Sequence, residues 1–296
     1  MIQKIVIFAV IVLLLSTTSF CNEAKRARFD LLRKRIDFTP DMFVKKALRN
    51  DNDILALFLK AKMDIEARNK DGDTALSASV KAGKLDSVKT LLDFKANPNA
   101  TDINNVPLLS LASKAGNVSV ANMLIKSGAQ VNAETETGRT ALMEAANAGK
   151  SDIVLLLTTR KANVNSVDSE GNTALTYAVL NNHVSSVETL IAKGAHVHLK
   201  GKDGIPLLTH SSRQGFEKIS ELLVNWGADV NEADQEGTTP LIAAAYSGNI
   251  KILVLLISRG ADVKARNKAG GTALSYATSR NHSKAVEWLR TAGAKE

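Results

Sequence analysis

The sequence predicts an all-α solenoid in which eight helix-turn-helix units, with a period of 33 residues, stack one on the next. Three observations lead to this prediction. A Thr-Ala-Leu tripeptide recurs at multiples of 33 residues, leucines hold one place in every unit after the first, and a glycine or asparagine follows at a fixed distance. No insertion breaks the period from residue 39 onward, so the units follow one another without a gap.

The tripeptide sets the frame of the repeat. It begins at Thr74, Thr140, Thr173 and Thr272, with spacings of 66, 33 and 99 residues. Thr239 begins a Thr-Pro-Leu variant in the same frame. Because so many units agree, the period is a far more specific signal of a repeat architecture than a single short motif would be.

Two further columns of residues agree with this frame. The first leucine column is Leu76, Leu109, Leu142, Leu175, Leu208, Leu241 and Leu274, preceded by Phe43 in the first unit. The turn column is Gly83, Gly116, Gly149, Gly215 and Gly248, with Asn50, Asn182 and Asn281 in the other units. Asparagine tolerates a left-handed backbone better than most residues, so its exchange with glycine predicts a turn at this place.

The repeat resembles that of the ankyrin family. Gly227-Ala228-Asp229-Val230-Asn231 matches the family's Gly-Ala-Asp-Val-Asn segment in full, and Thr239-Pro240-Leu241 matches its Thr-Pro-Leu. The resemblance covers residues 39–296 and implies helix-turn-helix repeats joined by β-hairpin loops. The repeats are expected at residues 39–68, 69–101, 102–134, 135–167, 168–200, 201–233, 234–266 and 267–296.

One departure from the ankyrin pattern recurs throughout the chain. The family's histidine after Thr-Pro-Leu is replaced by Ser77, Ser110, Met143, Thr176, Thr209, Ile242 and Ser275. The resemblance therefore implies that a side-chain hydrogen bond near each threonine is lost.

The chemistry of the residues accounts for the stacking. The threonine that opens a unit can cap free N–H groups at the start of a helix. In the fourth repeat, Leu142, Ala145 and Ala146 form one apolar stripe, and a second helix is expected at about residues 151–159. No single unit can bury these faces, so a neighbour on each side must cover them.

The end of the second helix usually requires a residue in the left-handed conformation, most often glycine. Lys62, Lys95 and Lys161 occupy this place in three repeats. Each lysine is expected to cost on the order of 1 kcal/mol relative to glycine.

Residues 1–21 are predicted to form a secretory signal peptide. Lys4 precedes an apolar run of eleven residues at 5–15, and a polar stretch follows. Eleven residues rise only about 16 Å as a helix, too short for a membrane span of roughly 20 residues. A positive start, a short apolar run and a polar end are typical of an exported chain.

Two alternatives for this segment stay open. Lys and Arg cluster at residues 25–35, and positive charge tends to remain in the cytoplasm. A membrane anchor formed by residues 5–21, with the repeats in the cytosol, is therefore the alternative to export. Lipid modification of Cys21 is the second alternative, although Phe20 departs from the small residue that this modification motif requires.

The basic segment at residues 22–38 has Phe29, Leu32 and Ile36 at helical spacing. Such a helix could lie on a membrane surface or pack on the first repeat, and we favour packing. Membrane contact is accordingly expected only through residues 1–36.

Composition and charge disfavour catalysis and nucleic-acid binding. The formal net charge is +8, of which +4 lies in residues 1–40 and +4 is spread over the remaining 256 residues. A nucleic-acid binder is therefore only a remote alternative. The single cysteine, Cys21, can form neither an internal disulfide nor a cysteine-based zinc site. Because no insertion leaves room for a catalytic pocket, we expect no enzyme activity, no cofactor and no small-molecule substrate.

The five histidines fall into two groups. His183 and His282 follow the turn column and His210 lies in a core-facing column, so we expect structural roles for these three. His196 and His198 point the same way on extended chain and could share a metal or sense pH. No third metal ligand is evident in the sequence.

By resemblance, an ankyrin array binds its partner through the hairpin tips and the exposed side of the first helices. The expected tip residues are mostly acidic and comprise Asp71, Asp73, Asp102, Glu136, Arg139, Glu170, Asp203 and Glu236. The candidate partner-binding residues are Lys81, Lys114, Arg139, Asn147, Leu180, Arg213 and Tyr246. Tyr246, Arg213 and Leu180 are the predicted anchors, since tyrosine and arginine are favoured at binding hot spots.

The sequence therefore predicts a non-enzymatic, monomeric protein–protein interaction module. The leading interpretation is an adaptor, scaffold or inhibitor that is exported to the periplasm or secreted and binds a protein there. The alternative is a membrane-anchored cytosolic scaffold.

Overall fold

The computed structural model describes residues 23–200 and 203–294. The predicted signal peptide at residues 1–21, the alternative anchor at residues 5–21 and the alternative lipidation of Cys21 lie outside these residues. Within the described ranges, no helix is long and apolar enough to cross a membrane.

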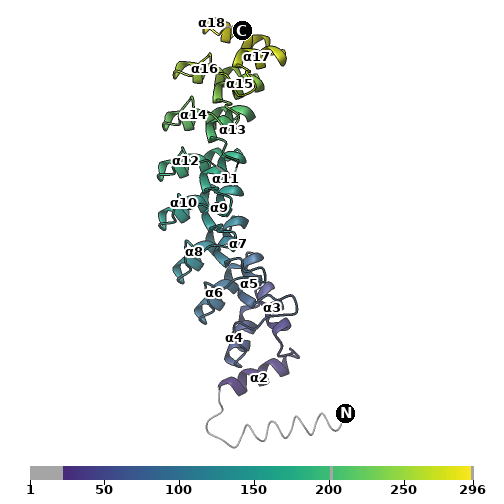
Figure 1. Ribbon diagram of the computed structural model, residues 1–296. Helices are drawn as coiled ribbons and strands as arrows, with labels where there is room; N and C mark the ends of the chain where they lie inside the picture. The colour runs from purple at the N-terminus through teal and green to yellow at the C-terminus, as the bar shows by residue number, and fades with distance from the viewer. Residues whose placement is uncertain (1–22, 201–202, 295–296) are drawn as a thin grey trace, which may run out of the picture. The chain divides into compact units, whose positions relative to one another are not determined.

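Helices account for all the regular structure of the described residues, apart from isolated β-bridges (Figure 1). The first helix, α2 (Glu23–Arg33), precedes eight consecutive helix pairs. The pairs are α3 (Pro40–Leu48) and α4 (Asn52–Lys60), α5 (Ala75–Lys81) and α6 (Leu85–Asp93), α7 (Leu108–Ala115) and α8 (Val118–Lys126), α9 (Ala141–Asn147) and α10 (Ser151–Thr159), α11 (Ala174–Leu180) and α12 (Val184–Ala192), α13 (Leu207–Gln214) and α14 (Glu217–Asn225), α15 (Pro240–Ser247) and α16 (Ile250–Ser258), α17 (Ala273–Ser279) and α18 (Ser283–Thr291).

The chain forms two compact units. Unit 1 runs to Asn104 and includes Lys126–Gly128, so it holds α2 to α6. Unit 2 consists of Asn105–Ile125 and the chain from Ala129 onward, so it holds α7, most of α8, and α9 to α18.

Within each unit the helices form two layers. In unit 2 the first helices of successive pairs pack side by side, in the order α7, α9, α11, α13, α15 and α17. The second helices α10, α12, α14, α16 and α18 form the other layer. In unit 1, α3 packs on α5 and α4 packs on α6 in the same way. The predicted all-α solenoid is therefore confirmed.

The core consists of thin layers of small and branched side chains. Leu142 is 1% exposed, and Ala145 and Ala146 beside it are fully buried. On the second helix of the same pair, Ile153 and Leu157 are buried as well. The alanines let adjacent first helices approach closely, so each apolar face is covered by its neighbours, as the stripe in the sequence predicts.

Threonine caps open six of the first helices. The hydroxyl oxygens of Thr39, Thr74, Thr140, Thr173, Thr239 and Thr272 each accept a hydrogen bond from the backbone N–H three residues on. These bonds satisfy one of the N–H groups that a helix start leaves free, as predicted.

The expected loss of a hydrogen bond near each threonine is wrong in three repeats. Ser77 and Ser275 accept a hydrogen bond from the N–H of the capping threonine, at 3.0 Å and 2.8 Å. Thr176 does the same for Thr173 at 3.3 Å. A short hydroxyl side chain at the third helical position thus closes a reciprocal capping box.

The lysines predicted at left-handed positions adopt that conformation. The φ angles are 65° at Lys62, 71° at Lys95 and 63° at Lys161. A side chain with a Cβ is strained in this region of the backbone map, so these three positions reduce stability relative to glycine.

The expected β-hairpins are tight turns with isolated β-bridges, such as Arg68↔Thr74 and Glu134↔Thr140. A side chain five residues before the helix cap holds the turn together. Asp234 Oδ1 accepts the N–H groups of Glu236 (3.0 Å) and Thr238 (2.8 Å). Asp168 Oδ1 binds two N–H groups of its own turn in the same way.

Asp102 occupies the equivalent place in the third repeat, which corrects its predicted position at an exposed tip. Only 4% of this residue is exposed, and its Oδ1 accepts the N–H of Asn104 at 2.9 Å. The carboxylate is drawn inward because it is the acceptor for the N–H groups of the turn.

The helix α2 packs on α4, as favoured from the sequence, but through a different face. Ala27 and Leu31 are buried, whereas Leu32 of the predicted stripe is 66% exposed. Arg28 secures the contact, because its Nε donates to Ala61 O at 3.2 Å and its guanidinium lies over the Phe38 ring.

Candidate functional site

One hollow among the first helices of unit 2 arises from a single column of residues. The fourth residue after the helix cap is Tyr177 in α11, His210 in α13 and Tyr276 in α17. In α15 the same place holds Ala243. A small side chain between larger ones leaves a depression above α15.

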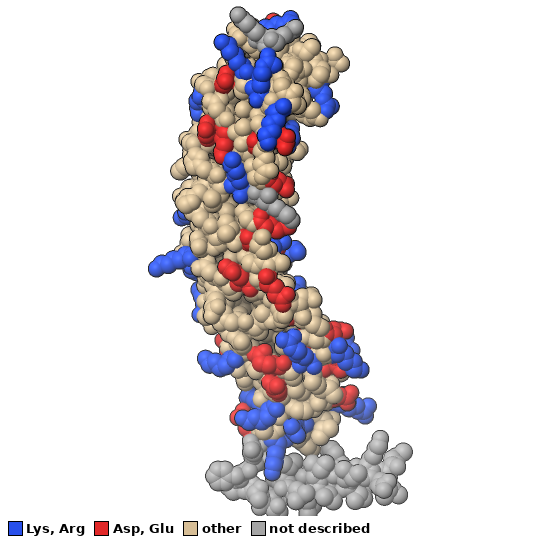
Figure 2. All heavy atoms as spheres, viewed as in Figure 1, with Lys and Arg blue, Asp and Glu red and all other residues tan. Residues whose placement is uncertain are grey.

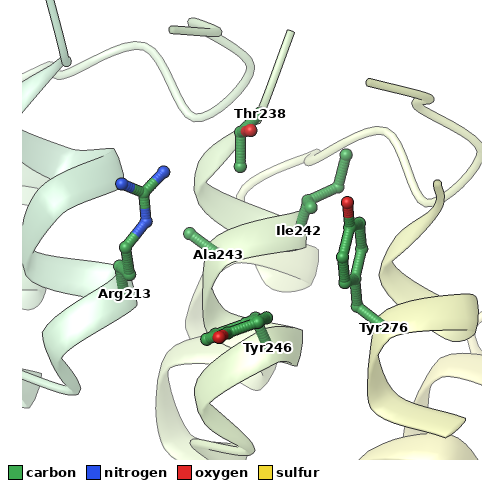
Figure 3. A pocket seen from close by; sticks show the side chains of 6 residues that line it. All are labelled: Arg213, Thr238, Ile242, Ala243, Tyr246 and Tyr276. Carbon is green, nitrogen blue, oxygen red and sulfur yellow. The ribbon is translucent and has the colours of Figure 1, made fainter. Parts of the chain in front are cut away.

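This depression is a cleft of about 330 Å³. Its lining residues, which we call the tyrosine cleft, are Arg213, Thr238, Ile242, Ala243, Tyr246 and Tyr276. Figure 3 shows Arg213 from α13 and Tyr276 from α17 on opposite sides, with Ala243 and Ile242 between them. Three successive helix pairs therefore build one site.

The tyrosine at the α17 side is held in place by its hairpin. Asn267 Nδ2 donates to Tyr276 Oη at 2.8 Å. Gly271 lies under the ring, where an added Cβ would approach the ring carbon Cε2 to 2.5 Å. The absence of a side chain at Gly271 thus lets Tyr276 lean on the hairpin and form a fixed wall.

Tyr246 forms the end of the cleft near the helix turn. It is 40% exposed, and its ring meets that of Tyr276 edge-on at 6.1 Å. The Arg280 guanidinium lies 3.9 Å from the centre of the Tyr246 ring and donates to its hydroxyl oxygen. Tyr246 is thereby oriented before any partner arrives.

Arg213 is oriented by an ion pair. Its Nη2 lies 3.1 Å from Oδ2 of Asp234, the mostly buried carboxylate that also holds the hairpin. About a third of the Arg213 side chain stays exposed, so it can meet a partner as well.

A known protein family shares this repeat architecture. A family model described as "Ankyrin repeats (3 copies)" matches residues 43–135, 109–201 and 207–295. The chain belongs to the ankyrin repeat family. Comparison with curated proteins finds no match. Ankyrin repeats indicate a protein–protein interaction module, and the fold is typically a non-enzymatic scaffold.

The ankyrin array brings two of the three predicted anchors together. Arg213 and Tyr246 line the tyrosine cleft, whereas Leu180 lies in a neighbouring pocket of about 240 Å³ between α11 and α13. Tyr177 and His210 line that pocket too. Arg213 and Tyr246 thus share one cleft, and Leu180 lies in a separate depression; the role of all three as anchors stays a prediction.

His210 lines a pocket, although its column predicted a core position. It is only partly buried, and its Nε2 is buried without a hydrogen-bond partner. Burial lowers the pKa of His210, the Arg213 charge adds to this effect, and the Asp203 carboxylate opposes it. The neutral imidazole is thus favoured in the folded array.

Arg139 and Asn147 are engaged within the array. Arg139 Nε lies 3.3 Å from Glu144 Oε1, and the guanidinium covers the Tyr177 ring. Asn147 Oδ1 accepts from Asn181 Nδ2 at 3.1 Å. Arg139 is therefore not the exposed tip that the sequence predicts, because it stacks on the next first helix.

The two candidate lysines differ in their surroundings. Lys81, in unit 1, lies 2.8 Å from Asp73 Oδ1 and 3.3 Å from Asp102 Oδ2. Burial lowers its pKa, but the hydrogen bonds and charges of both carboxylates outweigh burial and leave the pKa raised. Lys114, in unit 2, is exposed on α7.

The other histidines occupy two environments. His183 and His282 lie against the turn glycines Gly149 and Gly248 of the preceding repeats, with Nε2 at 3.1 Å and 3.2 Å from backbone carbonyl oxygens. These contacts match the structural role predicted for both. His196 and His198 are exposed. Among the residues that the structure describes, no three histidine, cysteine or acidic side chains gather as a metal site.

Proposed function

We propose that this ankyrin array is a non-enzymatic binding module whose tyrosine cleft contacts a partner protein. The observation that carries the proposal is the meeting of Arg213 and Tyr246, two residue types favoured at binding hot spots, in one cleft. Both are held in place by neighbours, so little side-chain entropy is lost on binding.

The charge distribution supports a protein partner over nucleic acid. On the face drawn in Figure 2, described Lys and Arg side chains lie among Asp and Glu along the molecule. A nucleic-acid footprint would require basic residues clustered on one face.

The exposed aromatic residues allow a matched test of this proposal. We expect Tyr246→Ala and Arg213→Ala each to weaken partner binding about thirtyfold, since truncating a hot spot costs about 2 kcal/mol or more. Trp226→Ala removes an exposed aromatic at the end of α14, in the second-helix layer, and should leave affinity unchanged. Circular dichroism and calorimetry should show that each variant is folded. Unchanged affinity in both cleft variants would reject the proposal.

The finer proposal is an exported adaptor, scaffold or inhibitor, supported by the pattern of residues 1–21. Intact mass after cell fractionation tests it. A periplasmic or external protein shortened by about 19 to 24 residues is expected. A full-length protein in the membrane fraction, with repeats open to cytosolic protease, would replace export by the anchored scaffold.

A further inference from the structure

The tyrosine cleft is apolar at its centre. Ala243 and Ile242 lie at its base, and the rings of Tyr246 and Tyr276 border it. A volume of about 330 Å³ lies at the lower end of the range for ligand pockets, about 300–1,000 Å³. The cleft therefore suits one or two side chains of an extended segment rather than a whole helix.

The two ends of the cleft differ in charge. At the hairpin end, Arg213 is paired with Asp234. At the turn end, Arg280 lies on the Tyr246 ring, and no carboxylate pairs with it among the residues that the structure describes. The turn end thus carries an excess positive charge beside an exposed aromatic ring.

A guanidinium in this position is suited to a carboxylate. Arginine can stack on an aromatic ring and still present N–H donors to an oxygen anion, in contrast to lysine. Charge-assisted hydrogen bonds of this kind are about twice as strong as neutral ones. A basic partner would instead bring its cation against both Arg213 and Arg280.

We propose that the tyrosine cleft binds an extended acidic segment of the partner protein. One aliphatic or aromatic side chain of the segment lies over Ala243, between Tyr246 and Tyr276. A neighbouring Asp or Glu pairs with Arg280 at the turn end. This assignment depends on the proposed binding function and adds the chemistry of the partner.

Selection of short random peptides on the immobilised full-length protein tests the proposal. Enriched peptides are resynthesised, and their affinities are measured by fluorescence anisotropy. We expect an Asp or Glu next to an aliphatic or aromatic residue in the enriched peptides. A single-stranded oligothymidylate serves as the second probe, since phosphate is the other anion that could meet Arg280.

Two cleft variants and one control separate shape from charge. Ala243→Leu fills the cleft, and Leu111 at the same place in α7 shows that the repeat accommodates this side chain. Arg280→Glu reverses the charge at the turn end. Lys284→Glu makes the same change in net charge at an exposed position of α18. Both cleft variants should lower the affinity for acidic peptides by at least about tenfold, and Lys284→Glu should leave it unchanged.

The possible outcomes distinguish this inference from the proposed function. Peptides that lack an acidic preference but lose affinity with Ala243→Leu would overturn the acidic partner and keep the cleft as a binding site. If no cleft variant weakens the binding of the enriched peptides, both the acidic segment and the cleft as a binding site would be overturned. Oligothymidylate binding that exceeds peptide binding and disappears in Arg280→Glu would assign the site to phosphate and overturn the acidic segment.

Discussion

Single side chains decide where the first-helix face of unit 2 is hollow. Sequence reasoning found Tyr246 and Arg213 because both stand in the exposed places just before the turn column. It missed Tyr276, Ala243 and Arg280, whose roles depend on contacts between repeats. The available signal was the column of Tyr276 and Ala243, where a small residue interrupts large ones.

His210 should make stability depend on pH. Its pKa is lowered below 6.5 in the folded state, so the unfolded chain binds more protons. The contribution is complete above the unfolded-state pKa of about 6.5 and is lost as pH falls from there through the lower folded-state pKa. Denaturant unfolding at about pH 7.5 and 5.5 should show a larger loss for the wild type than for His210→Gln.

The other histidines are shared by both proteins, so their effects cancel in this comparison. Equal losses of stability in the wild type and in His210→Gln would contradict the lowered pKa.

Lys95→Gly should stabilise the protein, because φ at Lys95 is 71° and glycine carries no strain there. The expected gain is about 1 kcal/mol in the free energy of unfolding, seen as a higher melting temperature. Lys84→Gly is the matched control, since φ at Lys84 is −82° and glycine gains nothing there. A melting temperature that stays the same or falls in Lys95→Gly would count against the strain.

Among the secondary-structure elements, the helices could be predicted from local chemistry, whereas the form of the hairpins could not. Threonine caps and apolar stripes are local, so α10 covers the predicted residues 151–159. The hairpins depend on side chains such as Asp168 and Asp234, which replace a strand ladder by direct bonds to the turn. The sequence does carry a signal for these turns, since an Asp, Asn or Thr stands five residues before the cap of most first helices.

The packed face of α2 shows why tertiary context was needed. Phe29, Leu32 and Ile36 have helical spacing, but α2 meets α4 through Ala27 and Leu31. The predicted and observed stripes lie on adjacent faces of one helix, and the choice between them depends on the packing against α4.

Leu142→Ala should destabilise the array by roughly 2–5 kcal/mol, because Leu142 is almost fully buried between first helices. Leu155→Ala in the same repeat is the control, since Leu155 is largely exposed on α10 and should cost about 0.5 kcal/mol or less. Urea unfolding of both variants checks the difference. Equal costs would show that the first leucine column does not form the core.

At the scale of the whole molecule, the period predicted the order of helix pairs but not the division into two units. The 33-residue period describes spacing along the chain. The two units are instead defined by contacts between residues in space, which the period does not describe. The tyrosine cleft likewise belongs to no single repeat, since α13, α15 and α17 each contribute. The proposed binding at this cleft therefore depends on the stacked array, and loss of stacking should remove it.

Site-specific photo-crosslinking in the native host tests whether the first helices form the binding face. A benzophenone side chain replaces Tyr246 or Leu180 on the first-helix face, or the exposed Trp226 or Trp288 in the second-helix layer. We expect one protein partner that is crosslinked from Tyr246 and Leu180 and not from the tryptophan positions. Crosslinking from Trp226 or Trp288 alone, or with equal yield from both layers, would contradict a binding face on the first helices.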